Sequence, residues 1–331
     1  MKRISVIGAG NWGTVLALLL EKKGCEVALW VYDPEQAKTM LDTRENPFLP
    51  GYALPTAMAV TTSIPEAISG AEAVVFAVRS KGAAEVARGL RECLPAGVPI
   101  INASKGLDGE TGLTMSQMFE SILSGANPIL ALSGPNIAAE IAKGVPTATV
   151  IASADEALAR EIQHVFVTPS LRVYTNSDIV GVELAGALKN IIAIAAGICD
   201  GMGFGDNTKA ALLTRGLAEI TRLGMKIGAR QATFMGLAGV GDLIVTCASP
   251  LSRNHRVGIG LGEGHKLDDV LAEIGQVAEG IPTTRAAYAL AQKHDTPMPI
   301  TEQVHKVLFD GKDPRAALSD LMSREPKDEI W

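Results

Sequence analysis

The sequence has few aromatic residues, few cysteines and no excess of positive charge. Aromatic residues make up 4% of its 331 positions, so small and aliphatic side chains must supply most of the core packing. The four cysteines are scattered and form no Cys-x-x-Cys pair, which predicts neither a zinc site nor a disulfide framework but reduced cysteines; they are Cys25, Cys93, Cys199 and Cys247. The net charge of −6 argues against nucleic acid as a partner, because nucleic-acid-binding surfaces are basic.

The sequence also lacks a secretion signal and a convincing membrane span. The first apolar run, Ile4–Ile7, is far shorter than the apolar core of a signal peptide. The most apolar later stretch, Val182–Ile198, is interrupted by Glu183, Lys189 and Asn190, and such residues are costly inside a bilayer. We therefore expect a cytoplasmic protein without an integral membrane segment.

The first half of the chain alternates short apolar runs with segments of helical periodicity, and the chain length favours two domains. Strands buried on both faces give continuous apolar runs, and helical crossovers join them in parallel. We therefore predict an α/β domain with a doubly wound parallel sheet over residues 1–177. Its strands are expected at Ile4–Ile7, Val27–Tyr32, Ala73–Val78, Val98–Asn102, Ile129–Leu132 and Thr147–Ala152, with Leu171–Tyr174 at one edge. Helices are expected between them at Trp12–Lys23, Pro34–Thr43 and Lys81–Cys93.

The second half, residues 178–331, has long segments of helical periodicity and no convincing strand. We predict an all-α domain here, with a ligand site at the seam between the two domains. The expected helices are Val180–Cys199, Asn207–Leu223, Ala229–Leu237, Leu267–Ile274, Pro282–Lys293 and Ile300–Leu308.

A glycine-rich segment directly follows the first predicted strand and opens a helix. It reads Gly-x-Gly-x-x-Gly, with Gly8 for a tight turn, Gly10 for close approach of a pyrophosphate and Gly13 for close packing of helix and strand. The amides at the start of that helix point at the phosphates. In this position the pattern predicts a Rossmann-like, dinucleotide-binding domain.

The end of the second predicted strand has two interpretations. Asp33 lies twenty positions after Gly13, where an acidic residue normally binds the ribose 2′-hydroxyl of NAD. Asp33 is also a good N-cap, with Pro34 at the first helical position and Gln36 completing a capping box. The sequence alone leaves both interpretations open.

Lys189 lies in the middle of a predicted helix among apolar neighbours. Burying an ammonium group is costly unless the group is paired or its pKa is lowered. A lysine with an adjusted pKa suits general acid–base catalysis on a carbinol. The alternative is a lysine whose ammonium group reaches solvent from a half-exposed helix.

Further polar segments follow predicted strands or interrupt the helical half. Lys105 and Asn136 each follow a strand, Asn136 after a Gly-Pro turn. A glycine-punctuated turn at Leu237–Thr246 carries Asp242 and Thr246. Ser252-Arg253-Asn254 places a guanidinium group between two hydrogen-bonding side chains, a combination that suits a phosphate ester.

Together these segments resemble the NAD(P)-dependent glycerol-3-phosphate dehydrogenase family of bacterial type. The resemblance extends from residue 4 to about residue 311 and implies reversible hydride transfer between sn-glycerol 3-phosphate and dihydroxyacetone phosphate, for phospholipid synthesis. The segments that carry it are Gly8–Gly13, Arg44–Pro47, Leu49–Gly51, Ser104–Leu107, Ser133–Asn136, Glu183–Asn190, Gly203–Asn207, Gly239–Leu243, Ser252–Asn254 and Pro299–Glu302.

The resemblance implies a role for each matching residue. Lys189 would accept the proton when glycerol 3-phosphate is oxidised, without a metal ion, and Asp242 would orient it. The residues that would bind substrate are Lys105, Gly134, Asn136, Lys189, Asp242, Thr246, Ser252, Arg253 and Asn254. The residues that would bind the dinucleotide are Gly8, Gly10, Asn11, Trp12, Gly13, Tyr32, Lys105, Ala138, Arg253, Val277 and Glu279. The resemblance also implies a homodimer formed through the helical domain.

The chain departs from the family at three positions. Tyr32 replaces a cation that would hold the 2′-phosphate of NADP, so we expect a preference for NAD. Arg79 stands where the family often has proline, and Asn136 stands where many members have Thr or Ser.

Two other functions remain open from the sequence. One is a related hydroxy-acid dehydrogenase with the same domain layout, although the Ser-Arg-Asn segment argues against it. The other is a non-catalytic NAD(H) sensor, for which no DNA-binding module is visible.

Overall fold

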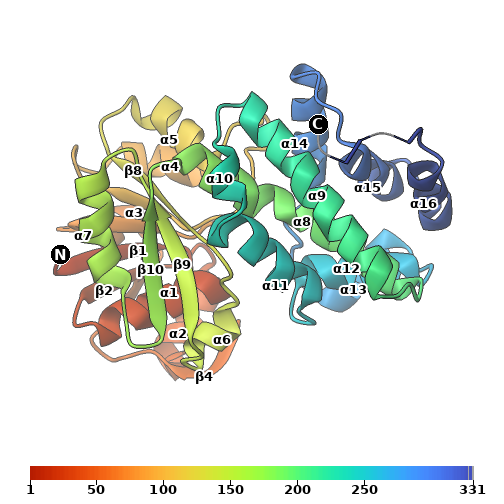
Figure 1. Ribbon diagram of the computed structural model, residues 1–331. Helices are drawn as coiled ribbons and strands as arrows, with labels where there is room; N and C mark the ends of the chain where they lie inside the picture. The colour runs from red at the N-terminus through yellow and green to blue at the C-terminus, as the bar shows by residue number, and fades with distance from the viewer. Residues whose placement is uncertain (327, 330–331) are drawn as a thin grey trace.

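The computed structural model describes residues 1–326 and 328–329 and has two lobes that lie side by side (Figure 1). The amino-terminal lobe contains an eight-stranded sheet, and the carboxy-terminal lobe is helical. The α/β fold class predicted from the sequence is therefore confirmed. The helical domain was predicted to extend to residue 331, of which residues 327, 330 and 331 lie outside the described part.

The main sheet has the strand order β10-β9-β8-β7-β6-β1-β2-β5. All seven predicted strands are present, with ends shifted by at most two residues. The sequence interpretation missed β5 and a separate two-stranded hairpin, because these strands are short and contain exposed or turn-forming residues. The strands of the sheet are β1 (Arg3–Ile7), β2 (Glu26–Trp30), β5 (Ala59–Thr61), β6 (Ala73–Phe76), β7 (Ile100–Asn102), β8 (Ile129–Ser133), β9 (Thr147–Ala152) and β10 (Leu171–Asn176), and the hairpin is β3 (Glu45–Asn46) with β4 (Leu49–Ala53).

Six strands of the sheet run parallel, as predicted, but β9 pairs with β8 in the antiparallel direction. The connection between them contains only a five-residue helix, α6 (Ala138–Ala142). A parallel crossover needs a dozen or more residues that carry the chain back along the sheet, and a five-residue helix spans only about 8 Å. The chain therefore turns back at the carboxyl end of β8. The longer helix α7 (Glu156–Phe166) then allows β10 to run parallel to β9.

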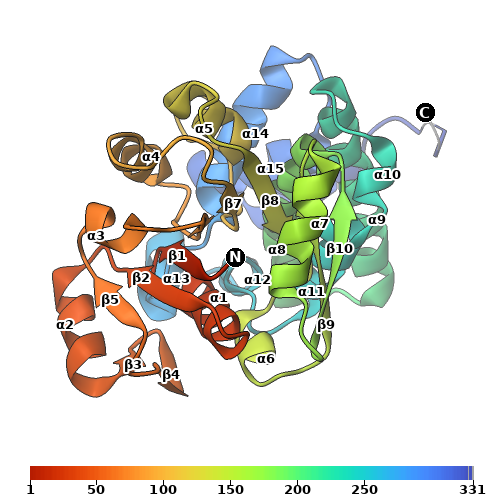
Figure 2. The ribbon, with the colours of Figure 1, turned by 90° about the vertical axis from the view of Figure 1, so that its left-hand side faces the viewer.

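Helices cover both faces of the sheet, as a doubly wound fold requires (Figure 2). One face packs against α1 (Asn11–Lys22), α2 (Pro34–Thr43) and α7 (Glu156–Phe166). The other face packs against α3 (Ile64–Ile68), α4 (Ala83–Arg91) and α5 (Met115–Leu123). The cores on the two faces are mainly aliphatic, as the scarcity of aromatic residues predicts.

The helical lobe is built around α8 (Ile179–Gly201), which is buried from Gly181 to Cys199. All six predicted helices are present, although the predicted Ala229–Leu237 is shortened to α10. The sequence interpretation missed α11, α12 and α16 in this lobe. The helices around α8 are α9 (Asp206–Lys226), α10 (Gln231–Phe234), α11 (Asp242–Ala248), α12 (Arg253–Gly262), α13 (Leu267–Ile274), α14 (Gly280–Lys293), α15 (Pro299–Phe309) and α16 (Pro314–Met322).

Two helical segments are long and apolar enough, by composition, to cross a membrane. The first, Ile179–Gly201, is the core helix α8, and 89% of its most apolar part is buried inside the protein. The second, Gln231–Ala248, joins α10 to α11 and is 39% buried. Core helices of soluble proteins pass the same test, so neither segment indicates a membrane span.

The helices α8 and α12 cross with their backbones in contact. A Cβ atom added at Gly258 would lie 2.1 Å from the carbonyl oxygen of Ile194, far inside van der Waals contact. Because α8 carries Lys189 and α12 begins at Arg253, this crossing fixes two candidate segments relative to each other. The glycines of the crossing are Gly197, Gly201, Gly258 and Gly262.

We expect Gly258→Ala to destabilise the protein by about 1–3 kcal/mol, the usual cost of overpacking a core. Gly109→Ala is the matched control, since a Cβ atom there meets no atom within 4 Å. Urea unfolding followed by circular dichroism measures both variants. Equal midpoints for the two variants would show that α8 and α12 do not need the glycine contact.

Candidate active site

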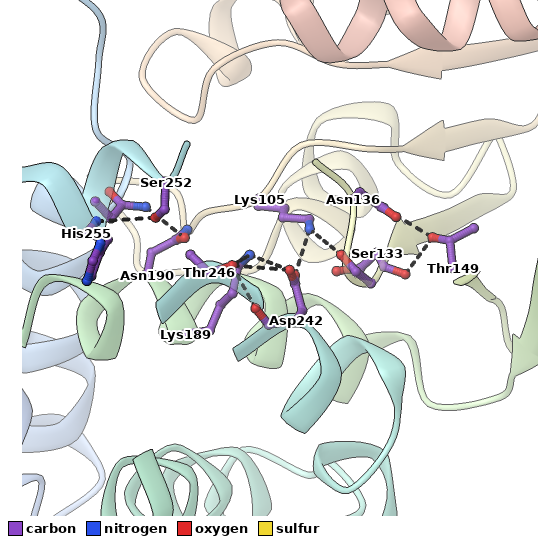
Figure 3. Close-up of polar contacts among 12 residues, drawn as sticks. Lys105, Ser133, Asn136, Thr149, Lys189, Asn190, Asp242, Thr246, Ser252 and His255 are labelled. Atoms are coloured by element: carbon purple, nitrogen blue, oxygen red, sulfur yellow. Dashed lines mark hydrogen bonds and ion pairs between the residues drawn. The ribbon is translucent and has the colours of Figure 1, made fainter. Parts of the chain in front are cut away.

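Four predicted site residues from distant parts of the sequence meet at the seam between the lobes (Figure 3). Lys105 follows β7, and Lys189 lies in the middle of α8. Asp242 is the first residue of α11, and Thr246 lies one turn later. Strand β7 ends at the same edge of the sheet as β1, because the two strands run in the same direction.

The Asp242 carboxylate binds both lysines. Its Oδ1 lies 2.5 Å from Lys189 Nζ, and its Oδ2 lies 2.7 Å from Lys105 Nζ. Asp242 is 1% exposed and Lys189 is 5% exposed, so this pair is shielded from solvent. Lys189 Nζ also donates to Thr246 Oγ1 at 2.5 Å, and Lys105 Nζ donates to the Gly134 carbonyl at 2.8 Å. Each ammonium group uses two of its three N–H donors in these contacts and can offer the third to a ligand.

Lys189 has a lowered pKa of about 8, and the main cause is its burial. The charge of Lys105 lowers the pKa further, while Asp242 opposes both effects by stabilising the charged amine. Near neutral pH the amine can therefore both hold and release a proton. The alternative of a lysine that reaches solvent is excluded by its burial.

The segment before Asp242 is not the turn that its glycines suggested. Residues Leu237–Gly241 form a turn of π-helix, called here the π-turn, which continues directly into α11. A Cβ atom at Gly239 would lie 2.0 Å from the carbonyl oxygen of Phe234. This glycine therefore permits close packing inside a wide helical turn and does not end the helix.

The Ser252-Arg253-Asn254 segment forms the start of α12. Ser252 is the N-cap, and its Oγ accepts from the His255 amide. Asn254 donates to Asn190 Oδ1 at 2.9 Å and accepts from the Gly280 amide at 2.8 Å. Arg253 is exposed. Asn190 follows Lys189 in the sequence, so the structure adds this amide to the candidate site although the sequence interpretation gave it no role.

The turn after β8 holds Gly134 and Asn136. Gly134 has a φ of +142° and lies against Thr149 of β9. The Thr149 hydroxyl donates to the Ser133 carbonyl and accepts from Asn136 Nδ2. Among the residues that the structure describes, the buried Oδ1 of Asn136 has no hydrogen-bond partner, so it can accept a hydrogen bond from a ligand.

The glycine-rich loop fits a dinucleotide. Gly8 has a φ of +115°, and a Cβ atom there would lie 2.5 Å from the Ala77 carbonyl oxygen. A Cβ atom at Gly13 would lie 1.9 Å from the Gly8 carbonyl oxygen, whereas one at Gly10 would meet nothing within 4 Å. Gly8 and Gly13 therefore serve the turn and the helix packing, and Gly10 leaves open space where a pyrophosphate can approach the amides of Asn11 and Trp12.

Two side chains for which the sequence predicted no contact with this loop hold it in place. Asn46 Nδ2 and Gln36 Nε2 both donate to the Ala9 carbonyl, at 2.9 and 2.7 Å. The expected capping box between Asp33 and Gln36 is therefore wrong, because Gln36 reaches the glycine-rich loop instead. The sequence feature that could have pointed to Asn46 is the Arg-Glu-Asn-Pro segment at residues 44–47. This segment was part of the family resemblance, but no role was assigned to it.

Trp12 belongs to an apolar cluster that also contains Ala138, at the start of α6, and Leu49 and Tyr52 of the hairpin. Figure 2 shows the β3–β4 hairpin and α6 near the two sides of α1. Two elements absent from the predicted fold therefore flank the start of α1, where the dinucleotide phosphates are expected.

The end of β2 holds the residues that would meet the adenosine ribose. Asp33 is the N-cap of α2, and its Oδ1 accepts from the Glu35 amide at 3.0 Å. Tyr32 is 72% exposed. The N-cap interpretation of Asp33 is confirmed, and its possible contact with ribose stays a prediction.

Val277 and Glu279 lie before α14. Ser80 Oγ donates to Glu279 Oε2 at 2.5 Å, which links this segment to the loop after β6. Burial raises the pKa of the Glu279 carboxyl, while the nearby charges of Arg253 and Arg79 lower it. The charges of Arg79 and Arg253 therefore both act on this carboxylate. Val277 is 38% exposed.

Comparisons with known proteins agree on one family. The family described as NAD-dependent glycerol-3-phosphate dehydrogenase matches by its N-terminal part over residues 3–159 and by its C-terminal part over residues 178–319. A glycerol-3-phosphate dehydrogenase [NAD(P)+] of Pelotomaculum thermopropionicum is 50% identical and covers 99% of this chain and 95% of its own.

A protein of the same name from Geobacter sulfurreducens is also 50% identical, over 100% of this chain and 99% of its own. The crystal structure of glycerol-3-phosphate dehydrogenase from Coxiella burnetii superimposes with a TM-score of 0.95 at 38% identity. That alignment covers 98% of this chain and 99% of the other.

We expect Asp242→Asn to lower the pKa of Lys189 from about 8 by about one to three units, because the amine loses its stabilising charge. Lys105→Gln should raise it, because a repelling charge is removed. NMR titration of protein labelled at the lysine ε-carbon measures both shifts. Shifts of the same sign in the two variants would contradict the charge arrangement.

Proposed function

The chain belongs to the NAD-dependent glycerol-3-phosphate dehydrogenase family, and we propose that it transfers a hydride reversibly between sn-glycerol 3-phosphate and dihydroxyacetone phosphate. The cofactor is NAD(P). The observation that carries the proposal is the buried Lys189–Asp242–Lys105 group at the sheet edge that also holds the glycine-rich loop. Strands β7 and β1 are separated by β6, so the strands that lead to these two parts lie about 10 Å apart across the sheet.

The glycine-rich loop would hold the dinucleotide. Its pyrophosphate would meet the amides at the start of α1, and Lys105, Arg253 and Glu279 would line the path toward the nicotinamide. When bound there, NAD(P) would supply the hydride chemistry at C2 of glycerol 3-phosphate and at the corresponding carbonyl carbon of dihydroxyacetone phosphate.

Lys189 would act as the general base in the oxidation and as the general acid in the reduction. In the oxidation its neutral amine accepts the proton of the C2 hydroxyl as the C2–O bond becomes a carbonyl. In the reduction its ammonium group donates a proton to the carbonyl oxygen. Asp242 and Thr246 hold two donors of the ammonium group and so orient the third. A pKa of about 8 suits both directions near neutral pH.

The remaining site residues would bind the phosphate end and the hydroxyl groups of the substrate. Arg253 offers a guanidinium group that can bind a phosphate through two hydrogen bonds, and Ser252 and Asn254 lie beside it at the start of α12. Binding energy from this end orients C2 for the reaction. Asn136 Oδ1 would accept from a substrate hydroxyl, and the Gly134 carbonyl positions Lys105.

The cellular role and assembly are proposals of the same kind. The enzyme would supply glycerol 3-phosphate for phospholipid synthesis in the cytoplasm. It would act as a homodimer, and the Gln231–Ala248 segment of the helical lobe offers a surface for this contact. That segment is apolar yet only 39% buried, and its exposed side chains include Met235 and Ile244.

The proposal is tested by following NADH or NADPH oxidation at 340 nm with dihydroxyacetone phosphate. Lys189→Ala should retain dinucleotide binding and lose about three or more orders of magnitude in kcat, since a general acid alone contributes roughly 10²–10⁴-fold and Asp242 is left unpaired. Arg253→Ala is the contrast, because it should mainly raise the KM for substrate. Normal turnover in Lys189→Ala would remove the assigned role of this lysine.

We expect a preference for NAD over NADP of at least about tenfold in kcat/KM. Tyr32 supplies no positive charge, and the Asp33 carboxylate next to it would repel a 2′-phosphate. Tyr32→Arg should narrow the difference by strengthening NADPH binding. A clear advantage for NADPH in the unmodified enzyme would contradict this assignment.

A further inference from the structure

A buried glutamate of α8 lies at the seam and has no part in the proposed chemistry. Glu183 is 6% exposed and precedes Lys189 on the same helix. Its Oε1 accepts from Asn102 Nδ2 at 2.8 Å, and its Oε2 accepts from Ser116 Oγ at 2.6 Å. The Ser116 amide lies 3.1 Å from both carboxylate oxygens. These contacts tie α8 to the end of β7 and to the start of α5.

A carboxyl group is costly at this position. None of the ion pairs found among the described residues includes Glu183, so only neutral donors stabilise its charge. Burial accordingly raises the pKa of Glu183, and the donated hydrogen bonds lower it. An apolar residue at position 183 would avoid the free-energy cost of burying a carboxylate. We infer that the hydrogen bonds of Glu183 serve to position the groups that donate them.

The contacts of Glu183 lead step by step to the lysine pair. Asn102 accepts the Ser104 amide with Oδ1 at 3.0 Å while it donates to Glu183. Ser104 Oγ donates to the Val78 carbonyl at 2.6 Å. The next residue, Lys105, reaches Asp242, and Asp242 reaches Lys189. The path therefore leaves α8 at Glu183 and returns to α8 at Lys189.

We propose that Glu183 is a positioning residue that holds the Ser104–Lys105 loop in register with α8, so that Lys105 and Lys189 share Asp242. This inference rests on the proposed dehydrogenase function, because it assigns a purpose to the lysine pair. It adds a residue outside the substrate and dinucleotide contacts.

The hydrogen-bond pattern makes Glu183→Gln a sharp test. A carboxylate accepts on both oxygens, whereas a glutamine amide has one acceptor oxygen. Its NH2 group must face either the Ser116 amide, which lies 3.1 Å from both carboxylate oxygens, or Asn102 Nδ2. Asn102 cannot resolve this by rotating its own amide, because its Oδ1 is needed by the Ser104 amide. Two donors then face each other in either orientation, and the loop that carries Lys105 should shift.

Glu183→Gln should lower kcat with dihydroxyacetone phosphate about tenfold to a hundredfold, the effect of disturbing one or two buried hydrogen bonds. The dissociation constant of NADH should change less than kcat does, because the glycine-rich loop lies two strands away and Lys105 is one of several expected dinucleotide contacts.

The pH profile gives a second readout. The groups that act on the Lys189 amine are Asp242 and Cys247 of α11 and Lys105. If Lys105 moves away from Asp242, its positive charge no longer repels the Lys189 ammonium group. The Asp242 carboxylate then stabilises Lys189 alone, and both effects raise the pKa of Lys189. The pH at which reduction of dihydroxyacetone phosphate falls off should therefore move upward from about 8. A purely structural role for Glu183 would not move it.

The double variant Glu183→Gln with Asn102→Asp should restore activity. The new aspartate accepts from the glutamine amide with one oxygen and keeps the Ser104 amide with the other. Asn102→Asp alone should be impaired, since two carboxyl groups then face each other. Recovery of kcat and of the pH profile in the double variant distinguishes a specific contact from general damage.

Glu219→Gln is the matched control, because Glu219 is also a buried carboxyl and accepts from the amides of Ile300 and Thr301 at the start of α15. It should lower thermal stability and leave kcat and the pH profile as in the unmodified enzyme. If Glu183→Gln behaves in the same way, the proposal is overturned. If Glu183→Gln does not fold, Ser116→Ala removes one donor only, and an unchanged kcat and pH profile there would equally overturn it.

Different results would overturn the proposed dehydrogenase function and the proposed role of Glu183. An unmodified enzyme without turnover of dihydroxyacetone phosphate would end the proposed function. The pKa of Lys189 measured by NMR in Glu183→Gln would still test whether Glu183 positions the lysine pair.

Discussion

The structure depends on one carboxylate that holds two lysines at once. Asp242 is almost completely buried and contacts Lys105 from the sheet lobe and Lys189 from the helical lobe. Burial favours the neutral amine of Lys189 and the carboxylate favours the charged one, so the balance of these two effects brings the pKa close to physiological pH. Because Asp242 contacts one lysine from each lobe, this arrangement exists only where the two lobes meet.

Most of the fold could be predicted from the sequence because its signals are local. Continuous apolar runs gave the seven strands, and the glycine-rich loop after the first run identified the dinucleotide lobe. The reversal of β9 could not be predicted, since it depends on the length of α6 and on the pairing of distant strands. The hairpin and β5 were missed for a related reason, because their short, partly exposed strands lack the apolar runs used to find the others.

The site was predictable in its residue types and much less so in its contacts. A lysine among apolar residues indicated Lys189, and the family resemblance implied that Asp242 orients it. Only the three-dimensional structure shows that Lys189 also donates to Thr246 and that Asp242 is shared with Lys105. The glycines of Leu237–Gly241 suggested a turn because glycine usually breaks helices, whereas here they allow a π-turn to pack against Phe234. Asn46, Gln36 and Glu183 bind groups far away in the sequence, so no local pattern reveals their partners.

The reversed strand β9 has a consequence for the position of Asp242. Val150 and Ala152 of this strand pack with Val182 of α8 and with Ala238 of the π-turn. The segment that ends in Asp242 therefore rests on a strand whose direction is set by a five-residue helix. Natural variation in the length of the 134–146 connection should then be limited by the candidate active site more than by the sheet. Relatives with other substrates are the place to look for longer connections.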